Sequence, residues 1–227
     1  KTSQPPTVRI KFWETITMHK SDNKVLNKVY TATNHEELMD AYKDWATDYD
    51  KDTVDRFGYV AHISSAQALH DAIDDRGAHI LDAGCGTGLV AETLAHLGYR
   101  NIDALDYSEE MLEVAEKKGL YKDYIQADLS RDLDIDKNKY DAVVCTGTFT
   151  YGHIDADGFE RLIRITKPGG INCFTIRDGA YQEYGYREKM VELEQQQAWE
   201  LMEMRNETYF TKESVQCKLC TYKVFAS

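Results

Sequence analysis

Three glycines at alternate positions, directly after a short apolar run, constrain the fold of this chain more than any other feature. The stretch reads His79-Ile-Leu-Asp-Ala-Gly-Cys-Gly-Thr-Gly-Leu89. Glycine is needed where a backbone turns sharply and must approach a ligand closely. A helix that begins near Leu89 would offer unpaired N–H groups to the same ligand. The pattern therefore predicts a buried strand, a ligand-binding turn and a helix in direct succession.

The alternation of strand-like and helical patterns continues along the chain. Short apolar runs lie at residues 79–81, 101–105, 124–127, 142–145 and 171–176. Helical patterns lie between them at about 89–97, 109–118 and 159–165, the second with Ser108 as N-cap and Gly119 beyond its end. Such alternation predicts a parallel sheet covered by helices on both faces. A helix over 186–197 and two strand-like pieces near 201–210 and 221–226 predict a closing hairpin or edge pair.

The first 76 residues precede this alternation and differ from it. Residues 1–34 include a strand-like alternation over Val8–Trp13 without an evident partner, so their structure is left open. Asn34 and Glu37 match a capping box. The helix that follows carries one aromatic face, made of Leu38, Tyr42, Trp45 and Tyr49. We expect an extension over 1–34, a helical cap over 35–76 and a larger domain over 77–227.

Composition excludes several classes of protein. The chain has 27 basic and 39 acidic residues and a net charge of −12, which disfavours nucleic acid as a partner because phosphate backbones are bound through basic residues. No apolar run approaches the roughly 20 residues of a membrane helix. Five thinly spread cysteines predict reduced thiols and a cytoplasmic location. Cys217 and Cys220 lack companion ligands, so no metal site is expected.

The spacing of the glycines distinguishes between two cofactor classes. Asp106, 22 residues beyond Gly84, is placed to accept hydrogen bonds from ribose hydroxyls. A dinucleotide site would require a third glycine at the position of Leu89. The observed G-x-G-x-G, two residues after Asp82, resembles the glycine-rich loop of class I S-adenosylmethionine-dependent methyltransferases. A carboxylate there suits the ammonium group of an amino acid cofactor.

The resemblance extends beyond the loop. The stretches Gln126–Leu129 and Lys167–Gly170 look like further hallmarks of that family. Tyr42–Asp50 and Gly147–His153 are similar to the Williams–Beuren syndrome region methyltransferase-like group. The resemblance implies a Rossmann-like, doubly wound α/β fold with a seven-stranded, mostly parallel sheet and an N-terminal helical cap. It also implies S-adenosyl-L-methionine as the cofactor. A small-molecule methyl acceptor is expected because the chain is acidic overall and shows no added recognition domain.

The same resemblance assigns the site residues. Those expected to hold the cofactor are Tyr42, Tyr49, Asp82, Gly84, Cys85, Gly86, Gly88, Asp106, Tyr107, Met111, Ala127, Asp128, Leu129 and Thr146. Those expected to line the acceptor pocket are Trp45, Thr148, Phe149, Tyr151, Arg177 and Tyr184. Tyr42 and Tyr49 could equally be packing residues, and Asp128 could instead cap the next turn.

The expected reaction is an in-line methyl transfer to an O, N or S nucleophile, in which alignment supplies most of the acceleration. His153 is the candidate general base because histidine has an unperturbed pKa of about 6.5, and a purely structural role for it is about as well supported. Two alternatives stay open: a non-catalytic S-adenosylmethionine-binding partner subunit and a protein methyltransferase. The acceptor, the methylated atom and the oligomeric state are not determined by the sequence.

Overall fold

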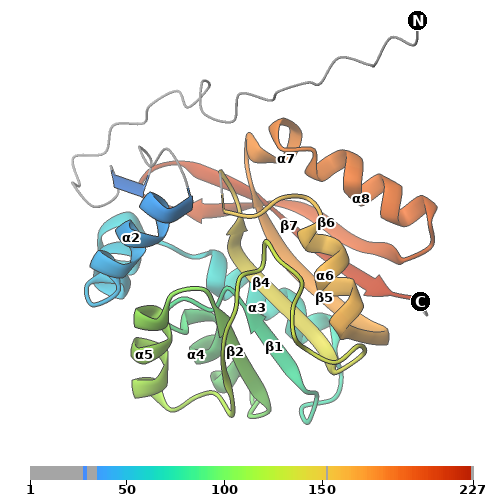
Figure 1. Cartoon of the computed structure of the whole chain (residues 1–227), viewed down its shortest axis with the longest axis horizontal. Coiled ribbons are helices and arrows are strands. Elements are labelled where there is room, and N and C mark those ends of the chain that lie inside the picture. The colour runs from blue at the N-terminus through green and yellow to red at the C-terminus, as the bar shows by residue number, and fades with distance from the viewer. Residues whose placement is uncertain (1–27, 30–34, 152, 226–227) are drawn as a thin grey trace, which may run out of the picture.

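One seven-stranded sheet runs through the protein in the order β3-β2-β1-β4-β5-β7-β6 (Figure 1). The computed structural model describes residues 28–29, 35–151 and 153–225. The strands are β1 (Ile80–Ala83), β2 (Ile102–Asp106), β3 (Tyr124–Gln126), β4 (Tyr140–Phe149), β5 (Thr166–Arg177), β6 (Trp199–Phe210) and β7 (Val215–Val224). Strands β1 to β5 pair in parallel, whereas β7 pairs antiparallel with both β5 and β6. The predicted Rossmann-like, mostly parallel sheet is confirmed.

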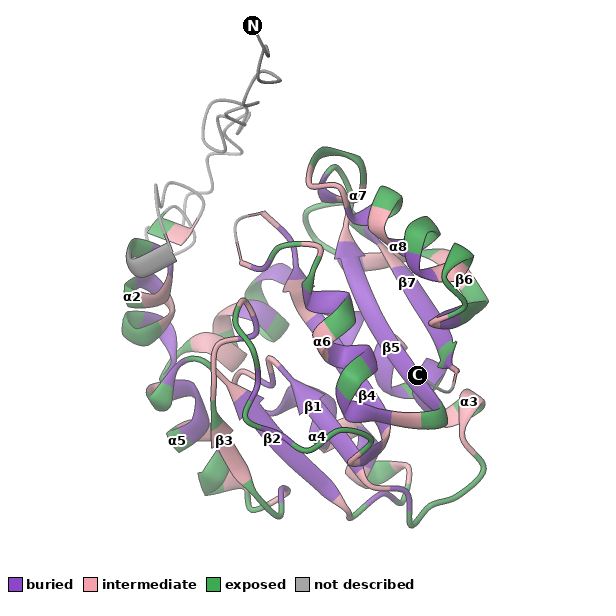
Figure 2. Cartoon of the chain, turned by 45° about the vertical axis from the view of Figure 1, so that its right-hand side comes forward, coloured by how far each residue is buried: buried purple, intermediate pink, exposed green. Residues whose placement is uncertain are grey.

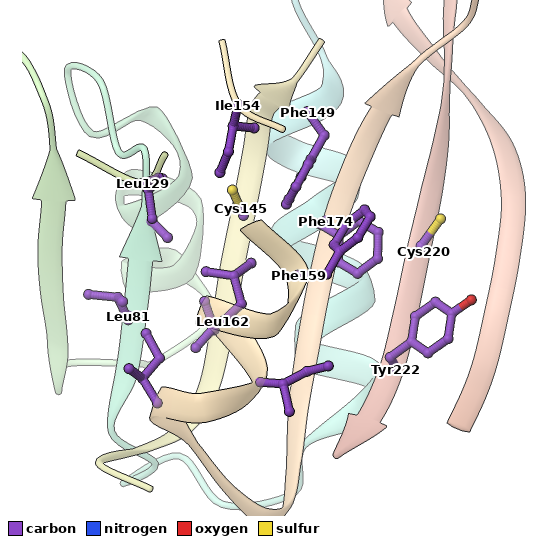
Figure 3. Packing of buried hydrophobic residues seen from close by; sticks show 14 of the residues in the cluster. Leu81, Leu129, Cys145, Phe149, Ile154, Phe159, Leu162, Phe174, Cys220 and Tyr222 are labelled. Carbon is purple, nitrogen blue, oxygen red and sulfur yellow. The ribbon is translucent and has the colours of Figure 1, made fainter. Parts of the chain in front are cut away.

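Helices cover both faces of this sheet. They are α3 (Ala61–Ala72), α4 (Leu89–His96), α5 (Glu109–Lys118), α6 (Gly158–Ile165), α7 (Ala180–Glu183) and α8 (Tyr186–Gln195). Neighbouring residues of β1 show the two layers: Ile80 packs in the cluster with α3, α4 and α5, and Leu81 packs in the cluster with α6 and α8. The central strands are buried along their length (Figure 2), and Figure 3 shows the second cluster, in which Phe159 lies against Phe174.

The helix ends follow the sequence signals. The Ser108 side chain accepts a hydrogen bond from the Met111 N–H at 3.2 Å, and Gly119 ends α5 in the left-handed conformation. In α3, Ala66 and Leu69 are buried against the sheet, whereas Ile63 is 50% exposed. The C-terminal hairpin closes the sheet, with β7 between β5 and β6.

A helical segment lies over the carboxyl ends of β1 and β2. It consists of α2 (His35–Trp45) and a π-helix, η1 (Lys51–Phe57). Lys43 forms an ion pair with Glu110 of α5, and Asp50 bonds both Lys118 of α5 and the Thr87 hydroxyl of the glycine turn. The expected strand over Val8–Trp13 and the Asn34 cap fall outside the described residues.

Two sequence expectations concern features away from the site. Cys217 and Cys220 are buried on β7 and pack in different clusters, because residues three apart on a strand face opposite sides. None of the helices described is both long and apolar enough to cross a bilayer.

Candidate active site

The glycine turn joins β1 to α4, and two of its three glycines leave room for a neighbouring side chain. All three have positive φ: +72° at Gly84, +53° at Gly86 and +93° at Gly88. A Cβ at Gly84 would lie 2.3 Å from the Thr148 hydroxyl oxygen, and a Cβ at Gly88 would lie 3.1 Å from the Tyr121 ring. A Cβ at Gly86 would meet no described atom within 4 Å. Gly86 is therefore the one whose missing side chain leaves space open to a ligand.

Asp106 ends β2 beside this turn and fixes its shape. One carboxylate oxygen accepts from the Gly86 N–H at 2.8 Å, and the other accepts from the Ser108 N–H at 2.9 Å. Burial raises the pKa of Asp106, while these backbone hydrogen bonds oppose the rise. Each carboxylate oxygen has a second lone pair, so the side chain can still accept from two ligand hydroxyls.

A cavity of about 120 Å³ opens at the carboxyl ends of β1, β2 and β4. Its walls come from the cap, the glycine turn, the β2 and β3 ends, the β4 end and β6. Of the residues predicted to hold the cofactor, it is lined by Tyr42, Tyr49, Gly84, Gly86, Asp106, Tyr107, Met111, Ala127, Asp128, Leu129 and Thr146. Asp128 also accepts hydrogen bonds from the Ser130 backbone N–H and hydroxyl, so it both caps its turn and lines the cavity.

Three residues predicted to hold the cofactor are buried and are not among those that line the cavity: Asp82, Cys85 and Gly88. Asp82 is fully buried and accepts a hydrogen bond from the Tyr121 hydroxyl at 2.6 Å. Burial raises the pKa of the Asp82 carboxyl to about 7, although the Tyr121 bond opposes the rise. Burial also raises the pKa of the Cys85 thiol, which keeps it neutral and suits a packing role.

The residues predicted for the acceptor and the base are only partly brought together. Thr148 and His153 line the cavity, and His153 Nε2 lies 3.0 Å from the Tyr42 hydroxyl. Trp45, Phe149, Tyr151, Arg177 and Tyr184 are not in the lining.

Each of these five packs elsewhere. The indole N–H of Trp45 donates to Asp52 at 3.0 Å, and Phe149 stacks on Phe159 in the core. The Tyr151 hydroxyl donates to a backbone carbonyl at 2.6 Å, and Tyr184 stacks against Tyr186. The Arg177 guanidinium lies over the ring of Tyr209 at 5.1 Å.

The structure adds lining residues that the sequence reasoning did not select: Met39, Ser108, Gly147 and Tyr209. Tyr209 comes from β6, and a Cβ on Gly147 would lie 2.8 Å from its hydroxyl oxygen. Gly147 has a φ of +81°. A glycine directly before Thr148 was the signal available in the sequence, whereas Tyr209 had none.

The donor set fits S-adenosylmethionine. Among the described residues, Asp82 Oδ1 and Thr146 Oγ1 are buried side-chain atoms without a hydrogen-bond partner, and both belong to strands that end at the cavity. Asp106 suits ribose hydroxyls, and the open face of Gly86 admits a ligand against the backbone. Over the described ranges, three or more His, Cys, Asp or Glu side chains nowhere gather as a metal would require.

Comparison with known proteins agrees with this site. Residues 80–170 match the family model described as methyltransferase domain. Methyltransferase-like protein 27 from Homo sapiens is 34% identical over 166 residues, which cover 70% of this chain and 66% of the relative. Malonyl-[acyl-carrier protein] O-methyltransferase from Pectobacterium atrosepticum is 33% identical over 132 residues, covering 57% of this chain and 51% of the relative. The chain thus spans about two thirds of one relative and about half of the other.

A solved structure supports the fold independently. The S-adenosylmethionine-dependent methyltransferase from Aquifex aeolicus superposes with a TM-score of 0.59 at 17% identity, covering 80% of this chain and 98% of its own. Fold, glycine turn and family match together define an S-adenosylmethionine-dependent methyltransferase domain, whose cofactor is S-adenosylmethionine. More particularly, the chain is homologous to methyltransferase-like protein 27.

Proposed function

We propose that the protein is a methyltransferase that transfers the methyl group of S-adenosylmethionine in line to an uncharged small-molecule nucleophile. The observation that carries the proposal is the continuity of the cavity. The same space is lined by Asp106 and Asp128, which are expected to hold the cofactor, and by Thr148 and His153, which are expected to serve the acceptor, together with Tyr209. A non-catalytic binder would need only the first set, so the additional room favours an enzyme.

The charge of the lining supports an uncharged acceptor. Its acidic side chains, Asp106 and Asp128, lie where ribose and adenine are expected, and neither lysine nor arginine occurs among the described lining residues. An acceptor carboxylate would therefore lose its hydration without gaining a cation. Arg177, expected to suit such a carboxylate, lies over the rings of Tyr209 and Phe210.

The residues of the chain have defined tasks in this reaction. When bound, S-adenosylmethionine supplies the methyl group and a sulfur that leaves uncharged. Tyr42 and Tyr49 present aromatic faces to the cavity, which favours a desolvated positive centre. Thr148 and Tyr209 orient the acceptor. An acceptor hydroxyl can take the place of the Tyr42 hydroxyl at His153 Nε2, and the histidine then accepts its proton.

The experiment is a screen of small molecules with labelled S-adenosylmethionine, in which S-adenosylhomocysteine formation is measured. Sets of phenols, alcohols, amines, thiols and carboxylic acids of similar size are compared. Turnover confined to uncharged acceptors supports the proposal, and selective turnover of carboxylic acids contradicts it. Label that enters lysate proteins instead of metabolites would establish the protein methyltransferase alternative.

Two narrower assignments also belong to the proposal. The stretches Tyr42–Asp50 and Gly147–His153 support membership of the Williams–Beuren syndrome region methyltransferase-like group, and the His153–Tyr42 hydrogen bond joins them. Free, buried cysteines throughout the described chain support a reducing, cytoplasmic location. Cell fractionation with an antibody against the native protein tests the location.

A further inference from the structure

Tyr121 connects three parts of the glycine turn, although it lies 33 residues beyond the last glycine. It stands between α5 and β3, and it is 8% exposed. Its hydroxyl donates to Asp82 Oδ2 at 2.6 Å, and its ring occupies the space that a side chain on residue 88 would need. Tyr121 and Cys85 also pack in the same buried cluster. One side chain therefore touches the residues that precede, form and end the turn.

The contact leaves Asp82 half satisfied. Its second oxygen, Oδ1, is buried and has no hydrogen-bond partner among the described residues. A carboxylate kept in this state loses hydration without full compensation. A positively charged group of a ligand would compensate the carboxylate for its lost hydration, and the ammonium group of an amino acid cofactor is such a group.

We infer that Tyr121 is a positioning residue that orients the Asp82 carboxyl for the cofactor's ammonium group and favours its ionised form. The inference rests on the proposed function, since it assumes that the cavity binds S-adenosylmethionine. By donating to the carboxylate, Tyr121 favours the ionised form of Asp82, which is the form that attracts an ammonium ion. The third glycine of the turn is then required by this tyrosine.

Proton release should accompany binding. Four titratable groups interact with Asp82: Tyr121, Asp106 on β2, Cys85 in the turn and Cys145 on β4. The pKa values of both thiols and of the Tyr121 phenol are raised by burial, so these three stay neutral near pH 7. Asp106 is the remaining anion, and it disfavours a second charge on Asp82. Affinity for an ammonium-bearing ligand should therefore rise with pH through about 7, the pKa of Asp82.

The test is isothermal titration calorimetry of S-adenosylhomocysteine from pH 6 to 8.5, with the wild-type protein and Tyr121→Phe. The variant should bind about tenfold or more weakly at pH 7, because a hydrogen bond to a charged group is lost. Its affinity should rise with pH at higher values than in the wild type, since the pKa of Asp82 increases. Ionisation of the ligand affects its binding to both proteins equally. The ratio of the wild-type affinity to the variant affinity at each pH therefore reports only the titration of groups in the protein.

Two controls separate this role from a structural one. 5′-Methylthioadenosine lacks the amino acid part, so the wild type and Tyr121→Phe should bind it equally at every pH. Tyr124→Phe removes a hydroxyl from the ring that packs edge-on against Tyr121 at 5.6 Å, and it should leave both ligands unaffected. A variant that binds both ligands more weakly, or that keeps the wild-type pH profile, would overturn the inference. Wild-type protein that binds neither ligand would overturn the proposed function as well.

Discussion

Substitution of Gly84 by alanine should destabilise the protein through Thr148, a residue of the cavity lining. The φ of +72° at Gly84 costs an L-residue about 1–2 kcal/mol. The new Cβ would also lie 2.3 Å from the Thr148 hydroxyl oxygen, and overpacking of this kind costs about 1–3 kcal/mol. The free energy of unfolding should therefore fall by about 2–5 kcal/mol.

A double-mutant cycle, with unfolding by urea in the absence of cofactor, measures how much of this loss of unfolding free energy comes from the contact between the new Cβ and Thr148. Thr148→Ala removes the hydroxyl oxygen at 2.3 Å and leaves a carbon at 3.4 Å, which is an ordinary contact. In that background Gly84→Ala should retain only the backbone cost, giving a coupling of about 1–3 kcal/mol. Gly86→Ala is the matched control, because its φ is also positive but its Cβ meets nothing in the described chain within 4 Å.

Gly86→Ala should therefore cost only about 1–2 kcal/mol, independently of residue 148, while it weakens S-adenosylhomocysteine binding. Equal destabilisation by the two alanines, or additive effects of Gly84→Ala and Thr148→Ala, would refute the reasoning.

Three further predictions concern the site and its support. Asp106→Ala should weaken S-adenosylhomocysteine binding about 10- to 150-fold in calorimetry, because charge-assisted bonds of roughly 1.5–3 kcal/mol are lost; unchanged affinity would place the ribose elsewhere. Once an acceptor is identified, His153→Ala should lower kcat about 100-fold or more with near-normal cofactor affinity, and equal turnover would remove the base role. Burial lowers the pKa of His62 to about 4, so the unfolded chain binds a proton there first as pH falls below 6.5. Unfolding free energy should then drop by up to roughly 3 kcal/mol between pH 6.5 and 4, and a His62→Gln variant with the same slope would contradict this.

The cofactor end of the site was predictable because its determinants are local. Strand, turn and helix follow one another within about ten residues, so the positions of Gly84 and Gly86 could be read from spacing, and Asp106 follows at the end of the next strand. The same locality makes the ends of α5 legible, since Ser108 and Gly119 act on their own helix.

The acceptor end was not predictable to the same degree, because it depends on side-chain direction and on distant segments. Consecutive residues of a strand face opposite sides, so Thr148 lines the cavity while Phe149 is buried against Phe159. Likewise the aromatic stripe of the cap divides: Tyr42 reaches the cavity, and Trp45 packs beneath it with Phe57. Tyr209 could be placed only after the antiparallel position of β6 was known.

The residues that line the cavity come from segments far apart in the sequence, so they are synthesised at different times. Tyr42 emerges early, whereas Tyr209 follows after all of the parallel strands have been made. During synthesis, the residues expected to bind the nucleoside are therefore present well before Tyr209 completes the cavity wall. Under the proposed function, the last hairpin to be synthesised contributes Tyr209 to the acceptor pocket, so changes of acceptor specificity can arise there without disturbing the residues expected to hold the cofactor.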